Sequence, residues 1–444
     1  MMIIRSITIL MLAMLAASSA AAQTTRPDAT QIQRTELSDV VLLLHSLGIN
    51  DVAAFDFLDK PDAWRIQQAE DLLAMLGALL PFRNTEYQTA RYRISAIGRH
   101  MLQIPTHPRY ARMLIEAQTR NCVVEVALMA ALVSGRDLLA RLNRADKAQQ
   151  RNRESLIKRG QTDTDYFLLA NAFQFAVQNN FDGRLCYSYG INAHVAREVA
   201  QSYRQLLEIA IDTGLITREA LSVEPEVSDS LHAPRPTLNV NSEAIQRCHL
   251  VGFVDHVAVR TSTGSDEFDL MGERRATLME ESVIGRNMLV VASELREITT
   301  RNNTKLTLLG FGSAVKPEWV RELDPPGYVE EVRHVYDRLH KRVIVGKIMR
   351  YHDLLIGGSP GAELDLNEAA RVLAEEFVDQ PGKLPMWNTQ VKQFLATNTF
   401  SRAEIVAALQ RAWHGCTELE AISRKPILPT LQSLLHNSAT RGGE

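Results

Sequence analysis

The chain has 444 residues, of which 45% are hydrophobic and 23% are charged. A chain of this length can bury several cores, and the usual size of a domain predicts about three domains. The formal net charge of −3 excludes a surface that is basic all round, so an acidic partner would have to bind to a local patch. We therefore expect a multidomain protein whose binding functions are confined to parts of its surface.

Residues 1–22 have the pattern of an export signal. Arg5 precedes an apolar run from Ile7 to Ala16, and three alanines follow from Ala20 to Ala22. The run is shorter than the roughly 20 residues that span a bilayer, so neither a membrane anchor nor a membrane partner is expected.

The four cysteines are sparse and contain no C-x-x-C pair: Cys122, Cys186, Cys248 and Cys416. This pattern predicts buried thiols and favours a cytoplasmic location. Their even number leaves two disulfides in an exported protein open. Two locations therefore remain: cytoplasmic, or exported with a signal peptide at residues 1–22.

Residues 27–107 are predicted to form two helices, a β wing and a further helix. Apolar residues at helical spacing run from Leu37 to Leu47 and stop at Gly48, which suits a helix C-terminus. A second helix follows Pro61, and the alternation around Tyr92 is that of a strand. This order of elements is that of a winged helix.

The remaining segments predict an α+β multidomain fold. Residues 108–217 have helical periodicity, for which a helical bundle is the simplest packing. Residues 218–241 are rich in Pro, Ser, Glu and Asp and predict a linker. Short apolar segments in 242–325 predict a small β-barrel or sandwich. Residues 326–440 begin with a strand-like run, broken by a turn at Asp337–Lys341, and continue as helices.

The glycine-rich motifs do not support catalysis. The sequence contains no G-x-x-x-x-G-K-[ST] loop to hold ATP phosphates, and Gly310–Ser313 is predicted to be a barrel turn. Gly357–Gly361 matches the G-x-S-x-G of a hydrolase, but Pro360 after Ser359 has no N–H for an oxyanion hole, so a Gly/Pro turn is the better interpretation. With no H-E-x-x-H and no His/Cys cluster, we expect no metal and no catalytic residue.

Two stretches of the chain are basic. Arg136–Arg159 contains eight Lys/Arg against three acidic residues, and Val332–His352 contains six against one with three histidines interleaved. A solvated helix face or a basic hairpin is one explanation. The functional alternative is contact with nucleic-acid phosphates, because fields of lysine and arginine supply most non-specific affinity.

Several strings resemble the helicase-associated region of DEAH-box helicases over roughly residues 27 to 436. The longest comprises Ile97-Gly98-Arg99-His100-Met101 and Ile104-Pro105-Thr106-His107-Pro108-Arg109-Tyr110-Ala111-Arg112-Met113-Leu114. The others are Arg34–Leu37 with Val40–Leu44 and Leu47–Ile49, Phe55–Asp59, Asp165–Phe173, Ile191–His194 and Arg204–Leu207. Two later strings, at 252–258 and 384–387, resemble the HrpB-type bacterial branch. The chain departs from the pattern at Tyr166, where a histidine would be expected.

The resemblance gives each segment an expected role. It implies a winged helix at 27–107, a helical ratchet bundle at 108–217, an OB-like β domain at 242–325, and a C-terminal hairpin with helices at 326–440. In the family these parts hold the exiting strand, so single-stranded RNA or DNA is the implied partner. ATP and magnesium would act only through RecA-like motor lobes, which this sequence lacks. No cofactor is therefore expected on the chain, and a separate RecA-like helicase motor is a candidate partner.

One helix face is the candidate nucleic-acid-binding site. Arg197 and Arg204 lie seven residues apart, two helical turns, and so share a face, with Asn192 just before the helix. A solvated face is the plain explanation, and a row of phosphate contacts is the functional one. The alternative function for the whole chain is that of an exported, non-catalytic binding or interaction protein.

Overall fold

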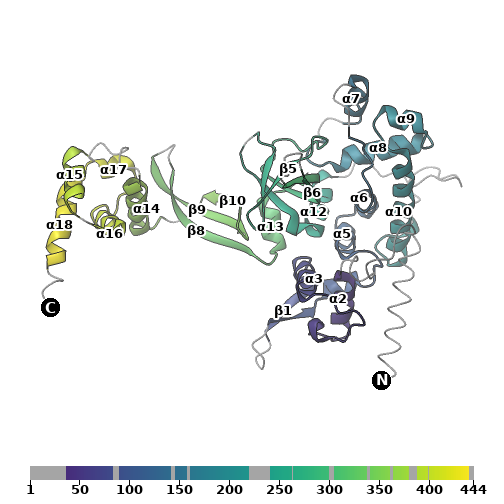
Figure 1. Cartoon of the computed structure of the whole chain (residues 1–444), viewed down its shortest axis with the longest axis horizontal. Helices are drawn as coiled ribbons and strands as arrows, with labels where there is room; N and C mark the ends of the chain where they lie inside the picture. Colours follow the sequence, from purple (N-terminus) through teal and green to yellow (C-terminus); the bar gives the residue numbers. More distant parts are fainter. Residues whose placement is uncertain are drawn as a thin grey trace. The chain divides into compact units, whose positions relative to one another are not determined.

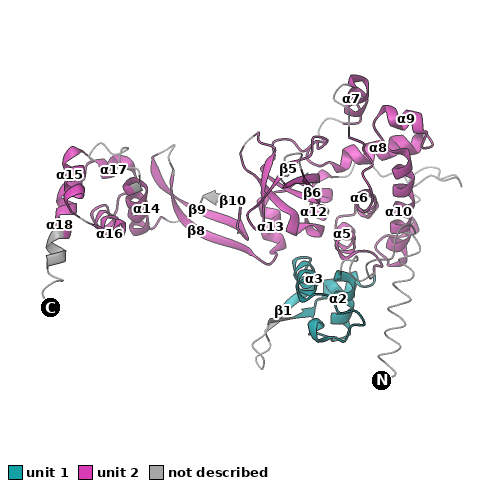
Figure 2. Ribbon diagram, in the orientation of Figure 1, with its two compact units in different colours: residues 1–103 teal, residues 104–444 magenta. Residues whose placement is uncertain are grey.

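The computed structural model describes residues 37–83, 90–141, 146–157, 161–219, 241–262, 264–299, 305–337, 341–360, 364–379, 388–398 and 400–439. These residues belong to two compact units, 1–103 and 104–444, which Figure 2 shows in separate colours. Helices and several sheets occur together, which confirms the α+β class (Figure 1). The signal-like residues 1–22 and most of the predicted linker, residues 220–240, lie outside the described residues.

Unit 1 joins helices to a two-stranded antiparallel sheet. Its elements in order are α2 (Ser38–Ser46), the 3-10 turn η2 (Val52–Ala54), α3 (Ala63–Met75), β1 (Leu79–Arg83), β2 (Ala90–Ile94) and α4 (Ala96–Met101). Buried Val41, Leu44, Leu73 and Leu79 form the centre of its core. The elements agree with the predicted order, while the winged-helix label itself remains a prediction.

A serine cap and a glycine hold the start of α4 close to the segment before β1 in unit 1. The Ser95 hydroxyl donates to the carbonyl of Gly77 at 2.6 Å and accepts the N–H of Gly98 at 2.9 Å, so it caps α4. A Cβ on Gly98 would lie 2.3 Å from the carbonyl oxygen of Ala78. Only glycine fits there, which explains the glycine within the string at 97–101.

Unit 2 begins with a helical region. Its elements are α5 (Pro108–Thr119), α6 (Val123–Val133), α7 (Lys147–Glu154), α8 (Tyr166–Gln178), α9 (Gly183–Ser188), α10 (Ala193–Asp212) and α12 (Ser242–Gly252). Nine of the eleven residues of α6 are buried, which is expected of a helix that is apolar all round and central. Helices α5, α8, α10 and α12 pack against it.

A closed β-barrel follows the 3-10 turn η3 (Val254–His256). Its strands are β3 (Val257–Arg260), β4 (Glu267–Leu270), β5 (Arg274–Leu278), β6 (Leu289–Thr299) and β7 (Lys305–Ala314), arranged in the order β3-β4-β5-β7-β6. Phe268, Leu270, Val290 and Leu309 are buried in its interior. The sequence left a barrel and a sandwich open, and the structure has a barrel. The OB-like label remains a prediction.

The barrel shows that one expectation about glycines was wrong. Gly310–Ser313 is not a turn but lies within β7, where Phe311 adopts a φ of 46° while the pairing with β6 keeps the same register on both sides of it. A positive φ is uncommon for a residue that carries a side chain, and it marks a local distortion of the strand. A Cβ on Gly312 would lie 2.0 Å from Cδ1 of Ile284, so the glycine permits close packing rather than a reversal of the chain.

A three-stranded antiparallel sheet follows α13 (Pro317–Leu323). It contains β8 (Tyr328–Asp337), β9 (Arg342–Tyr351) and β10 (Leu354–Pro360), with β9 in the middle. Strands β8 and β9 pair with each other as far as Asp337 and Arg342, and residues 338–340 of the predicted turn lie outside the described residues. The predicted Gly/Pro turn at 357–361 is wrong for residues 357–360, which pair with β9 as an edge strand. An edge strand accommodates proline because its outer N–H groups need no partner.

The last helices form their own core. They are α14 (Leu366–Asp379), α15 (Thr389–Thr397), α16 (Arg402–Ala412), α17 (Leu419–Ser423) and α18 (Ile427–Ala439). Leu373, Phe377, Leu409, Trp413 and Leu431 are buried together, and Val343 of β9 joins them. The string at 384–387 lies outside the described residues.

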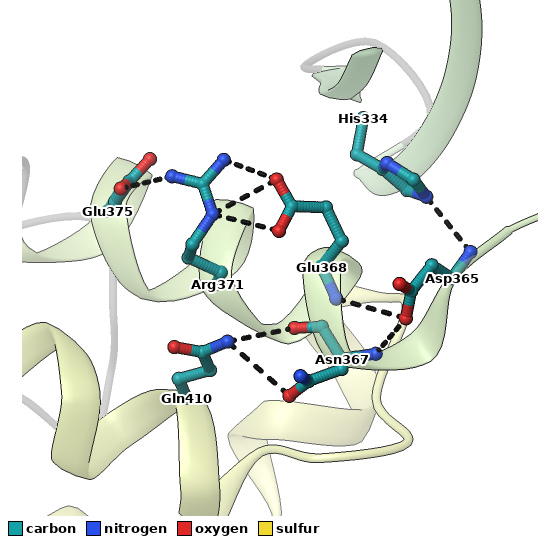
Figure 3. A network of polar contacts seen from close by, with 7 residues as sticks. All are labelled: His334, Asp365, Asn367, Glu368, Arg371, Glu375 and Gln410. Atoms are coloured by element: carbon teal, nitrogen blue, oxygen red, sulfur yellow. Dashed lines mark hydrogen bonds and ion pairs between the residues drawn. The ribbon is translucent and has the colours of Figure 1, made fainter. Parts of the chain in front are cut away.

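Polar contacts fix the start of α14 against β8 and α16 (Figure 3). The Asp365 carboxylate accepts the backbone N–H groups of Asn367 and Glu368, and its own backbone N–H donates to Nε2 of His334 at 2.9 Å. The Gln410 side chain donates to Asn367. The donated hydrogen bonds hold the pKa of the Asp365 carboxyl below its usual range, as expected at a helix N-terminus.

Candidate nucleic-acid interface

The predicted site lies on the exposed face of α10. Val195, Val199, Tyr203 and Leu206 are buried on the opposite face, while Arg197, Gln201, Arg204 and Glu208 are exposed. The seven-residue spacing therefore places both arginines on the solvent side of one helix. Acidic Glu208 on the same face reduces the local positive charge, so the face is mixed rather than uniformly basic.

Asn192 is the N-cap of α10. Its side-chain oxygen accepts the backbone N–H groups of His194 at 3.1 Å and Val195 at 3.3 Å. Capping uses the oxygen and leaves the amide N–H₂ group of this exposed residue as a donor. Asn192 therefore has a structural role whatever it binds.

The two arginines differ in how they are held. The Arg197 guanidinium donates to the carbonyl of Phe181 at 2.9 Å and lies over the Phe181 ring, 5.6 Å from its centroid. Arg204 makes no hydrogen bond or ion pair with any other residue that the structure describes. Arg197 is therefore pre-positioned with several N–H donors unused, whereas Arg204 would lose side-chain entropy on binding.

The first basic stretch contains a buried clamp as well as exposed cations. The buried Arg153 donates to the carbonyls of Ala140, Tyr189 and Gly190, the last at 2.6 Å. Burial lowers the pKa of this guanidinium. The two predicted roles, phosphate contact and a solvated helix face, do not apply to Arg153. Its guanidinium instead holds the segment after α9 through hydrogen bonds to carbonyls. Arg141 of the same stretch is exposed.

Helices α7 and α9 together present an aromatic ring and cations, which we call the α7–α9 surface: Lys147, Arg151, Arg184 and Tyr187. Tyr187 is 72% exposed, and all three cations are exposed. The Gln149 side chain donates to the carbonyl of Tyr187, and that of Asn152 donates to the carbonyl of Ser188 at 2.9 Å. Sequence reasoning missed Tyr187, because nothing in a six-residue helix indicates which side faces solvent.

The second basic stretch is divided between two sheet faces. Strand register places Arg333, Arg342 and Arg350 on one face and Lys347 on the other. Arg333 forms an ion pair with Glu331 at 2.6 Å. Exposed aliphatic residues, Val329, Val335, Ile344 and Leu355, lie among the three arginines. The positive charge of this stretch is thus less concentrated on one surface than its composition suggests.

A Ser–His pair in the structure is not a catalytic site. Nδ1 of His249 lies 2.8 Å from Oγ of Ser313, but both side chains are fully buried and Nε2 of His249 contacts Ser293 at 2.7 Å. Burial, with a smaller contribution from His256, lowers the pKa of His249 to about 3. A neutral, water-excluded imidazole between two hydroxyls joins α12 to β6 and β7 and has no access to substrate.

The start of α8 is tied to the same part of the barrel. The buried Asp165 carboxylate accepts the backbone N–H groups of Gly312 at 2.8 Å and Val283 at 2.7 Å, and the Ser282 hydroxyl. Burial raises the pKa of Asp165 to about 6, although these hydrogen bonds oppose the rise. Gly312, whose N–H donates to this carboxylate, directly follows Phe311 with its positive φ. The next residue, Tyr166, is buried, and its hydroxyl has no hydrogen-bond partner among the described atoms.

Comparison with known proteins relates this arrangement to a family. The family model of the helicase associated domain (HA2), ratchet-like, matches residues 107–169. The ATP-dependent RNA helicase HrpA of Escherichia coli K12 is 27% identical over 348 residues, covering 76% of this chain and 24% of the relative. Its homologue in Haemophilus influenzae is 26% identical over 316 residues, covering 67% and 21%. The chain is related to the C-terminal region of DEAH-box RNA helicases.

This relationship covers a limited part of the helicases. The chain spans less than a quarter of the length of the two curated relatives. The solved structure of the Escherichia coli DExH-box NTPase HrpB aligns with 93% of this chain and 43% of that chain, with 18% identity and a TM-score of 0.43. The sequence predicted an HrpB-type relative; HrpB is the solved structure named here, and these two curated relatives are of the HrpA type.

The family match and the predicted site do not coincide. Residues 107–169 include α5, α6, α7 and Asp165, whose carboxylate is hydrogen-bonded to the barrel. Asn192, Arg197 and Arg204 lie beyond this segment. No described helix is long and apolar enough to cross a membrane. Among the described residues, no group of three or more His, Cys, Asp or Glu side chains could hold a metal ion.

Proposed function

We propose that this chain is the accessory region of a DEAH-box ATP-dependent RNA helicase and that it holds single-stranded nucleic acid, with RNA as its substrate. The observation that carries the proposal is the ratchet-like match at residues 107–169, together with two relatives named as ATP-dependent RNA helicases. The exposed arginines of α10 and the α7–α9 surface support it, because they supply phosphate donors and one ring on which a base can stack.

ATP hydrolysis is not assigned to these 444 residues, because they contain no P-loop pattern. In this proposal ATP and magnesium act in RecA-like lobes outside these residues, on the same or another polypeptide. The function of this chain is then to keep a strand engaged while the motor steps. The cytoplasm, where RNA helicases meet their substrate, is the proposed location.

The test is a salt titration of RNA binding. A short fluorescent single-stranded RNA is titrated with the full chain, and anisotropy gives the dissociation constant at several salt concentrations. If about four to six phosphates are neutralised, a slope near −0.7 per phosphate predicts a roughly hundredfold loss of affinity between 50 and 200 mM salt. Absence of binding at the lowest salt would show the proposal to be wrong.

A charge-reversal variant locates the site. Arg197→Glu with Arg204→Glu should weaken binding to all sequences alike, because phosphate contacts position a strand without reading its bases. The matched control is Lys392→Glu with Arg424→Glu, which makes the same charge change at exposed positions of α15 and at the end of α17. If both double variants weaken binding equally, net charge rather than the α10 face controls affinity, and the site assignment is wrong.

A further inference from the structure

Two of the four cysteines are in contact. Cys122, the N-cap of α6, and Cys248, in the middle of α12, are 126 residues apart in sequence, and their Sγ atoms are 3.7 Å apart. Both side chains are fully buried. Cys186 and Cys416 are also buried and free, and neither sulfur contacts another sulfur within the described residues. Of the six pairs that four cysteines can form, the structure brings this one into contact within the described residues.

The surrounding packing holds the two thiols in place. Helix α12 packs closely on α5, since a Cβ on Gly252 would lie 2.5 Å from Cγ of Met113. The Arg109 guanidinium of α5 donates to the carbonyl of Gly252 at 3.0 Å and to both carboxylate oxygens of Asp255 at 2.6 Å. These contacts fix the C-terminal end of α12 against α5. To form a bond, the two sulfurs have to approach from 3.7 Å to a bond length of about 2.05 Å.

We propose that Cys122 and Cys248 form an intramolecular disulfide in an oxidising medium, and that this bond ties the start of the ratchet-like region to α12. The oxidant is a small disulfide such as oxidised glutathione. One thiolate attacks a glutathione sulfur and releases one glutathione thiolate; the second cysteine thiolate then attacks the mixed disulfide and releases the other. The chain loses two hydrogens and one oxidised glutathione becomes two reduced molecules.

Burial determines when this reaction takes place. The thiolate is the attacking species, and burial, followed by the hydrogen bond and charge of Cys122, raises the pKa of Cys248 well above its usual value. In the closed fold the pair therefore reacts slowly and stays reduced in a reducing medium. During folding, or when α12 detaches transiently, the thiols are exposed while still close together. The bond is thus formed mainly as the chain folds.

Peptide mapping tests the proposal on the full chain. Each cysteine falls in a different tryptic peptide, and the two of interest are residues 121–136 and 248–260. The chain is unfolded, refolded in a glutathione redox buffer, alkylated and digested without reductant. Mass spectrometry should show these two peptides joined with the loss of two hydrogens, and the thermal midpoint of the oxidised chain should rise by several degrees relative to the reduced chain.

The Cys186→Ala, Cys416→Ala double variant is the matched control, because it leaves only the proposed pair. It should give the same cross-link, and addition of reductant should abolish both the cross-link and the shift in midpoint. The proposal is overturned if both thiols of the double variant remain alkylatable after refolding under oxidation, or if Cys122 in the wild type links mainly to Cys186 or Cys416. RNA binding plays no part in this test, so its outcome is independent of the proposed function.

Discussion

Arg109 and Asp255 form a bidentate ion pair within unit 2, with both guanidinium–carboxylate distances at 2.6 Å. Arg109 lies in α5, inside the segment that matches the helicase-associated domain, and Asp255 lies in the turn that leads into the barrel. Both side chains are largely buried, and the Arg109 guanidinium also lies over the Phe253 ring. One pair thus connects the ratchet-like helices to the barrel.

Replacing Arg109 by lysine should destabilise the chain by about 2 kcal/mol, because lysine cannot make the paired hydrogen bonds and leaves the carboxylate partly unsatisfied. Thermal unfolding of the full chain measures the change. The control is Arg424→Lys, whose partner Glu420 and own side chain are both more than 70% exposed, and it should change stability by less than about 1 kcal/mol. Equal effects of the two substitutions would show that the buried pair has no special role.

The same pair should make the chain sensitive to acid. Burial raises the pKa of Asp255. The hydrogen bonds and charge of Arg109 lower this pKa by more than burial raises it, so the folded-state pKa lies below the ordinary value. A depressed pKa contributes stability above the unfolded-state value near 3.9, and this contribution is lost as the pH falls through the folded-state value. Wild type and Arg109→Lys should therefore converge in stability at low pH.

Asp165 should show the opposite dependence on pH. Its folded-state pKa of about 6 lies above the unfolded value near 3.9, so the folded chain binds the proton more tightly. The contribution of this group to stability is then complete below about pH 4 and falls by about 3 kcal/mol as the pH rises through 6, at about 1.4 kcal/mol per pKa unit.

Asp165→Asn isolates that dependence, because asparagine does not titrate. It should also destabilise the chain by about 1–3 kcal/mol, since its amide N–H₂ would face the backbone N–H of Gly312 or Val283 and leave it unpaired. Urea unfolding of both proteins at pH 4 and pH 7 gives the difference in free energy. If that difference is the same at the two pH values, Asp165 does not titrate in this range.

Single substitutions should separate the two arginines of α10. Arg204→Ala should weaken RNA binding and leave stability within about 0.5 kcal/mol, because Arg204 is exposed and its side chain makes no hydrogen bond, ion pair or ring contact with another described residue. Arg197→Ala should weaken binding and also lower the thermal midpoint, because it removes the contacts with Phe181. Anisotropy and thermal unfolding on the same samples measure binding and stability for both variants. If the thermal midpoint falls for Arg204→Ala but not for Arg197→Ala, Arg204 rather than Arg197 has the structural role.

Tyr187 should contribute to RNA binding if a base stacks on its ring. Tyr187→Ala would then weaken affinity by about 1–3 kcal/mol, the usual range for one stacked base. Leu185→Ala is the matched control, since Leu185 is an exposed apolar residue of the same helix α9. Tyr187→Phe should bind as the wild type does. Loss of binding in Tyr187→Phe but not in Tyr187→Ala would exclude stacking.

The isolated chain should neither bind nor hydrolyse ATP, because no phosphate-cradling loop occurs in it. Phosphate release measured with and without RNA should stay at the level of buffer. Turnover that persists through repeated purification, and that copurifies with the 49.7 kDa chain, would reveal a nucleotide site that the sequence does not show.

The sequence by itself determined several local elements and the likeness to a helicase family. The helix that stops before Gly48 and the two-turn spacing of Arg197 and Arg204 follow from periodicity and from the conformational limits of glycine, which act over a few residues. The string around residues 97–114 indicates the helicase-associated region through the identity and order of its residues alone.

Only the tertiary structure decided what individual side chains do. Arg153 and Arg151 are two residues apart in one basic stretch, yet Arg153 is buried against three carbonyls and Arg151 is exposed. The hydrogen bond from Gly312 to Asp165 and the contact between Cys122 and Cys248 likewise join residues more than a hundred positions apart. Burial and pairing arise where distant segments pack together, and local spacing carries no information about which segments meet.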